Sequence, residues 1–148
     1  MSVARRREAL IEARNWIGTP YRHQASAKRV GADCLGLIRG VWRSLYGQEP
    51  EPVPAYSPDW SERGGAAERL LIAAQRWMIE IQLDEAGPGD VLIFRFKPGC
   101  PAKHCAIQSA EDRMIHAWQG RAVCDTAIGP WWRRRRAGAF RFPSQLQD

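Results

Sequence analysis

The sequence predicts an α+β domain in which N-terminal helices pack on a C-terminal, mostly antiparallel β-sheet. Two observations carry this prediction. Apolar residues recur at helical spacing through the first half of the chain, whereas the second half holds short runs of β-branched and aromatic residues between turns. Helices that precede strands, without alternation, are typical of α+β folds. At 148 residues the chain has the size of one domain, so we expect a single domain over residues 1–148.

The first predicted helix spans residues 3–17. The residues at helical spacing in this segment are Leu10, Ile11, Ala13, Arg14 and Ile17. The segment Gly18-Thr19-Pro20 then stops the pattern, because glycine and proline end helices.

The second predicted helix starts near Asp33 and ends at Gly47. Its apolar positions are Cys34, Leu37, Ile38, Val41, Trp42 and Leu45. Gly36 and Gly40 each cost about 1 kcal/mol of helix propensity, so we expect them to permit close packing against another element.

A third helix is predicted over residues 66–78, after a loop over residues 48–58 that contains four prolines. The turn Gly87-Pro88-Gly89-Asp90 introduces a buried strand at residues 91–96. Further strands are expected at residues 104–109, 113–118, 121–126 and 137–142.

Composition and charge narrow the function classes. Seven tryptophans and 26% charged residues argue against disorder. The net charge of +6 makes polyanions plausible partners, and the apolar runs are too short to span a bilayer, so we expect no membrane insertion. The N-terminus lacks the apolar stretch of a secretory signal. The chain is therefore expected to be made in the cytoplasm without a signal peptide, or to have lost one before residue 1. The four cysteines are expected to be mostly free thiols.

Cys34 falls in the first turn of the second predicted helix, where the helix dipole and free N–H groups favour the thiolate, the form that attacks. A small buried cysteine on the core face is the alternative. His104 and His116 lie on two strands predicted to form a hairpin. In a register that places Ala106 opposite His116, both imidazoles lie on one face as diagonal neighbours. This register needs an odd loop or a bulge.

Together these residues fit Cys-His nucleophilic catalysis, in which a histidine takes the thiol proton and a third polar group orients that histidine. A zinc site is the competing interpretation, with the candidate ligands Cys100, His104, Cys105 and Cys124. His104 and Cys105 are consecutive on a strand and point to opposite faces, and the C-x-x-C spacing is absent, so we expect no metal.

Five motifs in order resemble those of the NlpC/p60 family of papain-like bacterial cell-wall cysteine endopeptidases. They are Gly18-Thr19-Pro20-Tyr21, Asp33-Cys34-Leu35-Gly36-Leu37-Ile38, Pro88-Gly89-Asp90-Val91-Leu92-Ile93-Phe94, His104-Cys105-Ala106-Ile107 and Ile115-His116-Ala117. The resemblance covers about residues 3–142. The segments Tyr21-Arg22-His23-Gln24 and Cys34-Leu35-Gly36 are most similar to the branch encoded by phages and gene transfer agents.

The resemblance implies a papain-like fold and a site without a cofactor. Cys34 would be the nucleophile, His104 the base and acid, and His116 the polar third member, while the Tyr21 hydroxyl would help to bind the oxyanion. The implied substrates are peptidoglycan stem peptides, commonly cut at the γ-D-glutamyl to diaminopimelate bond. The implied partners are tail-hub or tail-tip proteins of a phage-like particle, which would deliver the enzyme to the periplasm or wall of the target cell. Leu35 and the loss of Gly-Gly after Tyr21 depart from free-standing wall hydrolases.

Other interpretations stay open. We interpret His23 as a loop residue. The run Trp131-Trp132-Arg133-Arg134-Arg135-Arg136 suits base stacking and phosphate contact, but we favour a partner protein, an anionic wall polymer or a solvated rim over nucleic acid. The alternatives to the enzyme are a structural tail-hub component with a vestigial site and a small basic nucleic-acid-binding protein.

Overall fold

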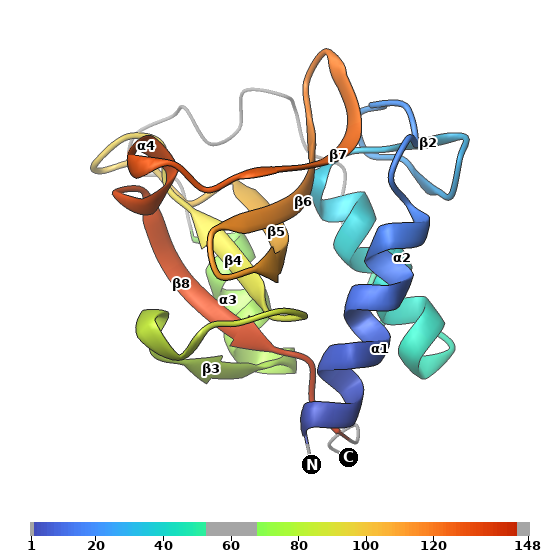
Figure 1. Cartoon of the computed structure of the whole chain (residues 1–148), viewed down its shortest axis with the longest axis horizontal. Helices are drawn as coiled ribbons and strands as arrows, with labels where there is room; N and C mark the ends of the chain where they lie inside the picture. The colour runs from blue at the N-terminus through green and yellow to red at the C-terminus, as the bar shows by residue number, and fades with distance from the viewer. Residues whose placement is uncertain (1, 53–67, 145–148) are drawn as a thin grey trace.

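The computed structural model describes residues 2–52 and 68–144 (Figure 1). Its helices are α1 (Ser2–Asn15), α2 (Cys34–Tyr46), α3 (Arg69–Trp77) and α4 (Pro130–Arg133), with a 3₁₀ turn η2 (Leu83–Glu85). The strands of the main sheet are β3 (Ile79–Ile81), β4 (Val91–Phe94), β5 (His104–Ala110), β6 (Arg113–Trp118), β7 (Arg121–Ala127) and β8 (Arg136–Arg141). A small second sheet joins β1 (Ser26–Ala27) to β2 (Gly31–Ala32). Among the described residues, no helix is long and apolar enough to cross a membrane.

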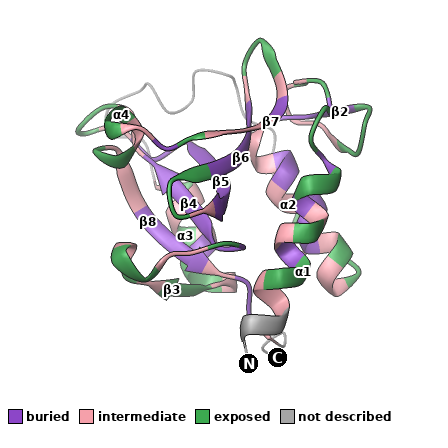
Figure 2. Ribbon diagram, in the orientation of Figure 1, coloured by how far each residue is buried: buried purple, intermediate pink, exposed green. Residues whose placement is uncertain are grey.

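The main sheet has the order β3-β8-β4-β5-β6-β7, and each neighbouring pair of strands is antiparallel. The helices α1 and α2 lie side by side next to this sheet (Figure 1). Buried residues, in purple, lie along the central strands of the sheet and on parts of the neighbouring helices (Figure 2). The α+β prediction, with N-terminal helices on a mostly antiparallel sheet, is confirmed.

Alternation along the strands divides the core into two clusters, because successive side chains point to opposite faces of a sheet. The larger cluster lies between the sheet and the helices and includes Ile93, Cys105, Ile107, Leu37 and Val41. The smaller cluster covers the opposite face and includes Leu92, Phe94, Ala106, Met114 and Ile128. The site described below involves both faces.

Close packing of α1 on α2 depends on Gly40. A Cβ atom at this position would lie 2.0 Å from Cζ2 of Trp16, which shows that the indole occupies the space above the glycine. The expected role of Gly40 in close packing is therefore confirmed. The pattern expected for α1 is partly wrong, because Ile11 is 52% and Ile17 45% exposed. The residues buried here are Ala9 and Ala13 of α1 and Trp16, which follows the end of the helix.

The β5–β6 hairpin has the predicted register. Ile107 lies opposite Ile115 and Gln108 opposite Met114, after which the register shifts and Ala110 pairs with Arg113. The buried side chain of Gln108 stabilises this bulge, since its Nε2 donates to the carbonyl oxygens of Ala110 (3.0 Å) and Glu111 (3.2 Å). The bulge supplies the extra residue that the histidine register requires.

Asp90 connects three elements at the start of β4. Its carboxylate is fully buried and accepts two hydrogen bonds from Arg141, at 2.9 and 3.0 Å, and one from the backbone N–H of Gly87 at 3.0 Å. Arg6 of α1 lies 3.3 Å away. The turn at residues 87–90 is thus tied to both α1 and β8.

Several boundaries differ from the predicted ones. β4 ends at Phe94 rather than at residue 96, and α3 begins at Arg69, after Glu68 at its N-cap. The predicted start of this helix at residue 66 and most of the proline loop fall in residues 53–67, which lie outside the described residues. The short elements β1, β2, β3, η2 and α4 were not expected. All of them contain four residues or fewer, which is too short for a periodic pattern.

Candidate active site

Cys34 is the first residue of α2, as the sequence predicts, and Asp33 caps the helix. The Oδ1 atom of Asp33 accepts a hydrogen bond from the backbone N–H of Gly36 at 2.7 Å, and its Oδ2 accepts one from Gln24 at 2.8 Å. Gly36 is also confirmed as a site of close approach, because a Cβ there would lie 1.8 Å from the carbonyl oxygen of Ala25. These contacts fix the half-buried thiol at the positive end of α2.

The Cys34 thiol lies over the first residues of β5. Its Sγ donates to the carbonyl oxygen of Lys103 at 3.6 Å. A hydrogen bond with Cys105 and the nearby His104 imidazole lower the pKa of Cys34 well below its ordinary range, against the opposing effect of burial. The same contact and its own burial raise the pKa of Cys105 well above the usual value, so of the two thiols Cys34 is the one that gives up its proton more readily.

His104 and His116 meet on the sheet face opposite the helices. The Nε2 atom of His104 lies 2.8 Å from Nδ1 of His116, and each residue is only 4% exposed. The nitrogen of His104 that remains for the Cys34 thiol is therefore Nδ1. The register that places both imidazoles on one face is confirmed by the hairpin pairing.

The other ring nitrogen of His116 contacts a residue that the sequence reasoning missed. Nε2 of His116 lies 2.8 Å from Oγ1 of Thr126 on β7. Burial, together with the charge of His104, lowers the pKa of His116 from 6.5 to about 3, so this imidazole is neutral at pH 7. A neutral imidazole has one donor and one acceptor nitrogen, and both have partners here.

Aromatic rings surround the two histidines. Trp132 lies 5.0 Å from the His104 ring and 5.4 Å from the His116 ring, and Trp118 lies 5.2 and 6.3 Å from them. Phe96 stacks on His104 at 5.9 Å. This apolar enclosure accounts for the desolvation of His116.

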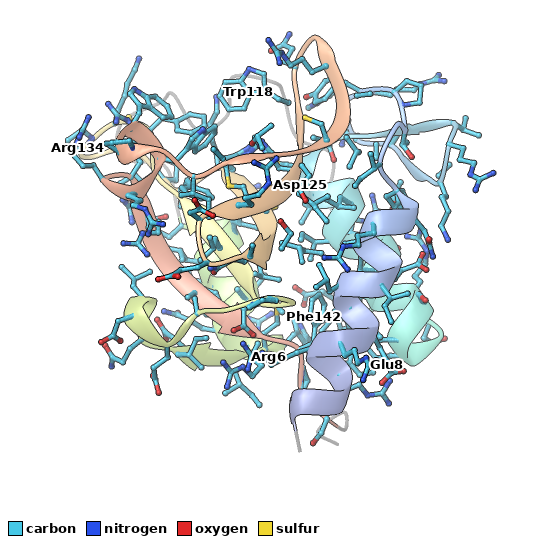
Figure 3. All side chains as sticks on the ribbon, in the orientation of Figure 1. Arg6, Glu8, Trp118, Asp125, Arg134 and Phe142 are labelled. Carbon is cyan, nitrogen blue, oxygen red and sulfur yellow. The ribbon has the colours of Figure 1, made fainter. Side chains whose placement is uncertain are left out.

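The run of residues 131–136 starts next to the histidines, which Trp132 contacts, and its arginines follow. Trp131 is 43% exposed, and the Arg135 guanidinium lies 3.8 Å from the centre of its ring. Figure 3 shows Trp118 beside β6 and β7 and Arg134 at the outer side of α4. Because Arg135 already covers one face of Trp131, base stacking there would have to compete with an intramolecular contact.

Tyr21 reaches the site from the loop before β1, where it forms a parallel bridge with Ala32. Burial and the charges of Asp33 and Cys34 raise the pKa of its hydroxyl, so the hydroxyl stays protonated at pH 7 and can donate. His23 lies in the same loop, as expected, with Nδ1 4.0 Å from Oδ2 of Asp33. The structure thus gathers Tyr21, Cys34, His104 and His116 around one end of β5.

The cysteines considered as zinc ligands do not gather. None of the four cysteines of the chain forms a disulfide, and within residues 2–52 and 68–144 no group of three or more histidine, cysteine, aspartate or glutamate side chains is placed to hold a metal ion. Cys105 contacts Cys34 instead, and Cys124 lies opposite His116 in the β6–β7 pairing.

Two residues of the site escaped the sequence reasoning. Cys105 was expected to point away from His104, and it does join the helix-facing cluster, but Cys34 is close enough to the start of β5 to interact with both residues. Thr126 lies opposite Met114, and this pairing puts it on the same sheet face as His116. Only the β6–β7 register, which was not predicted, could have identified it.

Comparisons with known proteins agree with this geometry. The model of the NlpC/P60 family matches residues 18–141. The chain is 23% identical over 124 residues to the probable endopeptidase NlpC of Escherichia coli (strain K12), covering 83% of this chain and 69% of that protein. It is 25% identical over 134 residues to the gamma-DL-glutamyl hydrolase of Bacillus subtilis (strain 168), covering 88% of this chain but only 28% of that protein.

A solved structure shows the same fold. The NlpC/p60 domain of the peptidoglycan hydrolase SagA superimposes with a TM-score of 0.62 at 22% identity, covering 91% of this chain and 97% of that domain. The family match includes every residue of the site from Tyr21 to Thr126. The chain therefore belongs to the NlpC/P60 family and is a cysteine-type endopeptidase.

Proposed function

We propose that the chain hydrolyses peptide bonds in peptidoglycan by forming an acyl-enzyme on Cys34. The observation that carries the proposal is the continuous row from the thiol of Cys34 through His104 to His116, with a lowered pKa at the thiol and a neutral imidazole at the far end. A nucleophile, a base and an orienting group in this order are the parts that thiol acyl transfer requires.

Each residue has a definite role in the proposed reaction. Nδ1 of His104 takes the proton from the Cys34 thiol, and the thiolate sulfur attacks the carbonyl carbon of the substrate. The Tyr21 hydroxyl and the backbone N–H of Cys34 donate to the oxyanion. His104 then gives its proton to the leaving amine as the C–N bond breaks, which leaves a thioester. A water molecule, deprotonated by His104, hydrolyses the thioester and restores the Cys34 thiol.

The proposed bond is the one between γ-D-glutamate and diaminopimelate in the stem peptide. Support comes from the motif resemblance and from the names of the relatives, one a gamma-DL-glutamyl hydrolase and another a peptidoglycan hydrolase. Leu35 stands beside the nucleophile, and Arg22-His23 follows Tyr21. At these positions the chain differs from free-standing wall hydrolases.

Incubation with purified muropeptides at about pH 6 to 9 tests this proposal. The wild type is expected to release new fragments detectable by mass spectrometry, Cys34→Ala to release none, and Cys100→Ala, which alters a thiol outside the site, to behave as the wild type. Intact muropeptides with the folded wild type would refute the hydrolase proposal. That result would favour a structural component, and salt-sensitive binding to single-stranded DNA would favour the nucleic-acid interpretation.

We also propose that the enzyme acts as part of a phage or gene-transfer-agent tail, bound to tail-hub or tail-tip proteins, and reaches the wall or periplasm of the target cell with the particle. The support is the similarity of Tyr21-Arg22-His23-Gln24 and Cys34-Leu35-Gly36 to that branch of the family. Particles purified from the producing cells by density gradient are expected to contain the chain. Its absence from intact particles would refute the tail role and leave the hydrolase proposal standing.

A further inference from the structure

We propose that Thr126 is a positioning residue, whose hydroxyl accepts the Nε2 proton of His116 and so makes accessible the tautomer from which His104 can serve as the base. This inference deepens the proposed function and rests on it, because it assigns a role to a residue behind the catalytic pair.

The β6–β7 pairing brings the hydroxyl to its partner. Cys124 lies opposite His116, and Thr126 lies opposite Met114, two residues earlier on β6. Thr126 is therefore the diagonal neighbour of His116 on the same sheet face. The 2.8 Å contact between Thr126 Oγ1 and His116 Nε2 has the same length as the contact between His116 Nδ1 and His104 Nε2. Both nitrogens of His116 thus lie within hydrogen-bond distance of a partner.

The positions of the ring protons of His104 and His116 depend on each other, because the two rings share one hydrogen bond. His116 is neutral at pH 7, since burial lowers its pKa to about 3, and so it carries a single ring proton. When that proton is on Nε2, it is donated to Thr126, and the Nδ1 lone pair accepts the Nε2 proton of His104. His104 then has a free lone pair on Nδ1, directed at the Cys34 thiol.

The opposite tautomer disables the site. With its proton on Nδ1, His116 would donate to Nε2 of His104. Because that nitrogen of His104 would then be the acceptor, a neutral His104 would have its single proton on Nδ1. A neutral His104 in that state cannot accept the proton of Cys34. The hydroxyl of Thr126 makes the productive tautomer accessible, because it gives the Nε2 proton of His116 an acceptor in a setting lined by Trp118 and Trp132.

Valine at position 126 retains the β-branched shape and removes the hydroxyl, so the productive tautomer would leave a largely buried N–H without an acceptor. An unsatisfied buried donor of this kind is expected to lower the rate of Cys34 alkylation by iodoacetamide about tenfold at pH 7 and to move the pH profile of alkylation up by about one unit. Serine keeps the hydroxyl and is expected to restore both values.

The experiment compares wild type, Thr126→Val and Thr126→Ser, with peptide mapping by mass spectrometry to follow Cys34 separately from the other three cysteines. Alkylation of Cys34 in folded Thr126→Val at the wild-type rate, with the wild-type pH profile, would overturn the inference. So would a loss in Thr126→Ser as large as that in Thr126→Val, because shape rather than the hydroxyl would then be responsible.

A measurement on the unmodified protein covers the case in which Thr126→Val does not fold. Two-bond ¹H–¹⁵N correlation spectra of the ¹⁵N-histidine-labelled wild type at pH 7 are expected to show His116 protonated on Nε2 and not on Nδ1; protonation on Nδ1 would overturn the inference. Neither assay uses a wall substrate. Muropeptides that stay intact would therefore count against the proposed function, whereas the tautomer and alkylation results decide the role of Thr126.

Discussion

Replacing His116 by asparagine should make the protein less sensitive to acid. Asparagine retains an acceptor for His104 and does not titrate. In the wild type the folded pKa of about 3 lies below the ordinary value of 6.5, so the unfolded chain binds a proton at this residue that the folded chain does not. Stability is therefore lost as the pH falls from about 6.5 towards 3. Between pH 7.5 and pH 5 this one group removes about 2 kcal/mol from the free energy of unfolding.

Urea unfolding at pH 7.5 and pH 5 measures the difference directly. The wild type is expected to lose about 2 kcal/mol more than His116→Asn over this interval, even though the variant starts from a lower stability at pH 7.5 because it lacks the contact with Thr126. The comparison of two losses cancels the titration of groups that both proteins share. Equal losses in the two proteins would refute the reasoning, since they would mean that His116 binds its proton equally well in the folded and unfolded chains.

Three further predictions concern the site and its supports. Tyr21→Phe should lower kcat on muropeptides about a hundredfold with little change in KM, if its hydroxyl binds the oxyanion; an unchanged kcat would remove Tyr21 from that role. Gly40→Ala should reduce the free energy of unfolding by about 1–3 kcal/mol in urea, because its Cβ would overlap the Trp16 indole, and wild-type stability would contradict the tight α1–α2 contact. Arg141→Met should cost about 3 kcal/mol by leaving the buried Asp90 carboxylate with Arg6 as its remaining arginine, and a cost below about 1 kcal/mol would show that Arg6 compensates.

The sequence was informative where pattern and local chemistry act together. Asp33 and Cys34 could be placed because a capping residue and an apolar helical pattern start at the same point. The histidine pair could be placed because alternation along two strands leaves few registers. Near α1 the pattern misled, since Ile11 and Ile17 are exposed whereas the small Ala9 and Ala13 are buried, and the indole of Trp16 fills the space above Gly40 of α2.

Other features depend on contacts between distant segments. β3 pairs with β8, so its existence depends on a strand nearly sixty residues away along the chain. The contact between Cys105 and Cys34 depends on where along β5 the first turn of α2 is placed. The contact between Thr126 and His116 depends on the register of β6 against β7. Such quantities arise from tertiary packing and have no counterpart in local sequence pattern.

The bulge that Gln108 stabilises between β5 and β6 has a consequence for how this hairpin can vary. Removing or adding a single residue in the turn would rotate one histidine to the helix side of the sheet, whereas a change of two residues would return it to the same side. An insertion or deletion of an even number of residues in this hairpin thus keeps both histidines on one face of the sheet, whereas an odd number separates them. A variant short of one turn residue would retain all of the site residues and yet lose the row that links Cys34, His104 and His116.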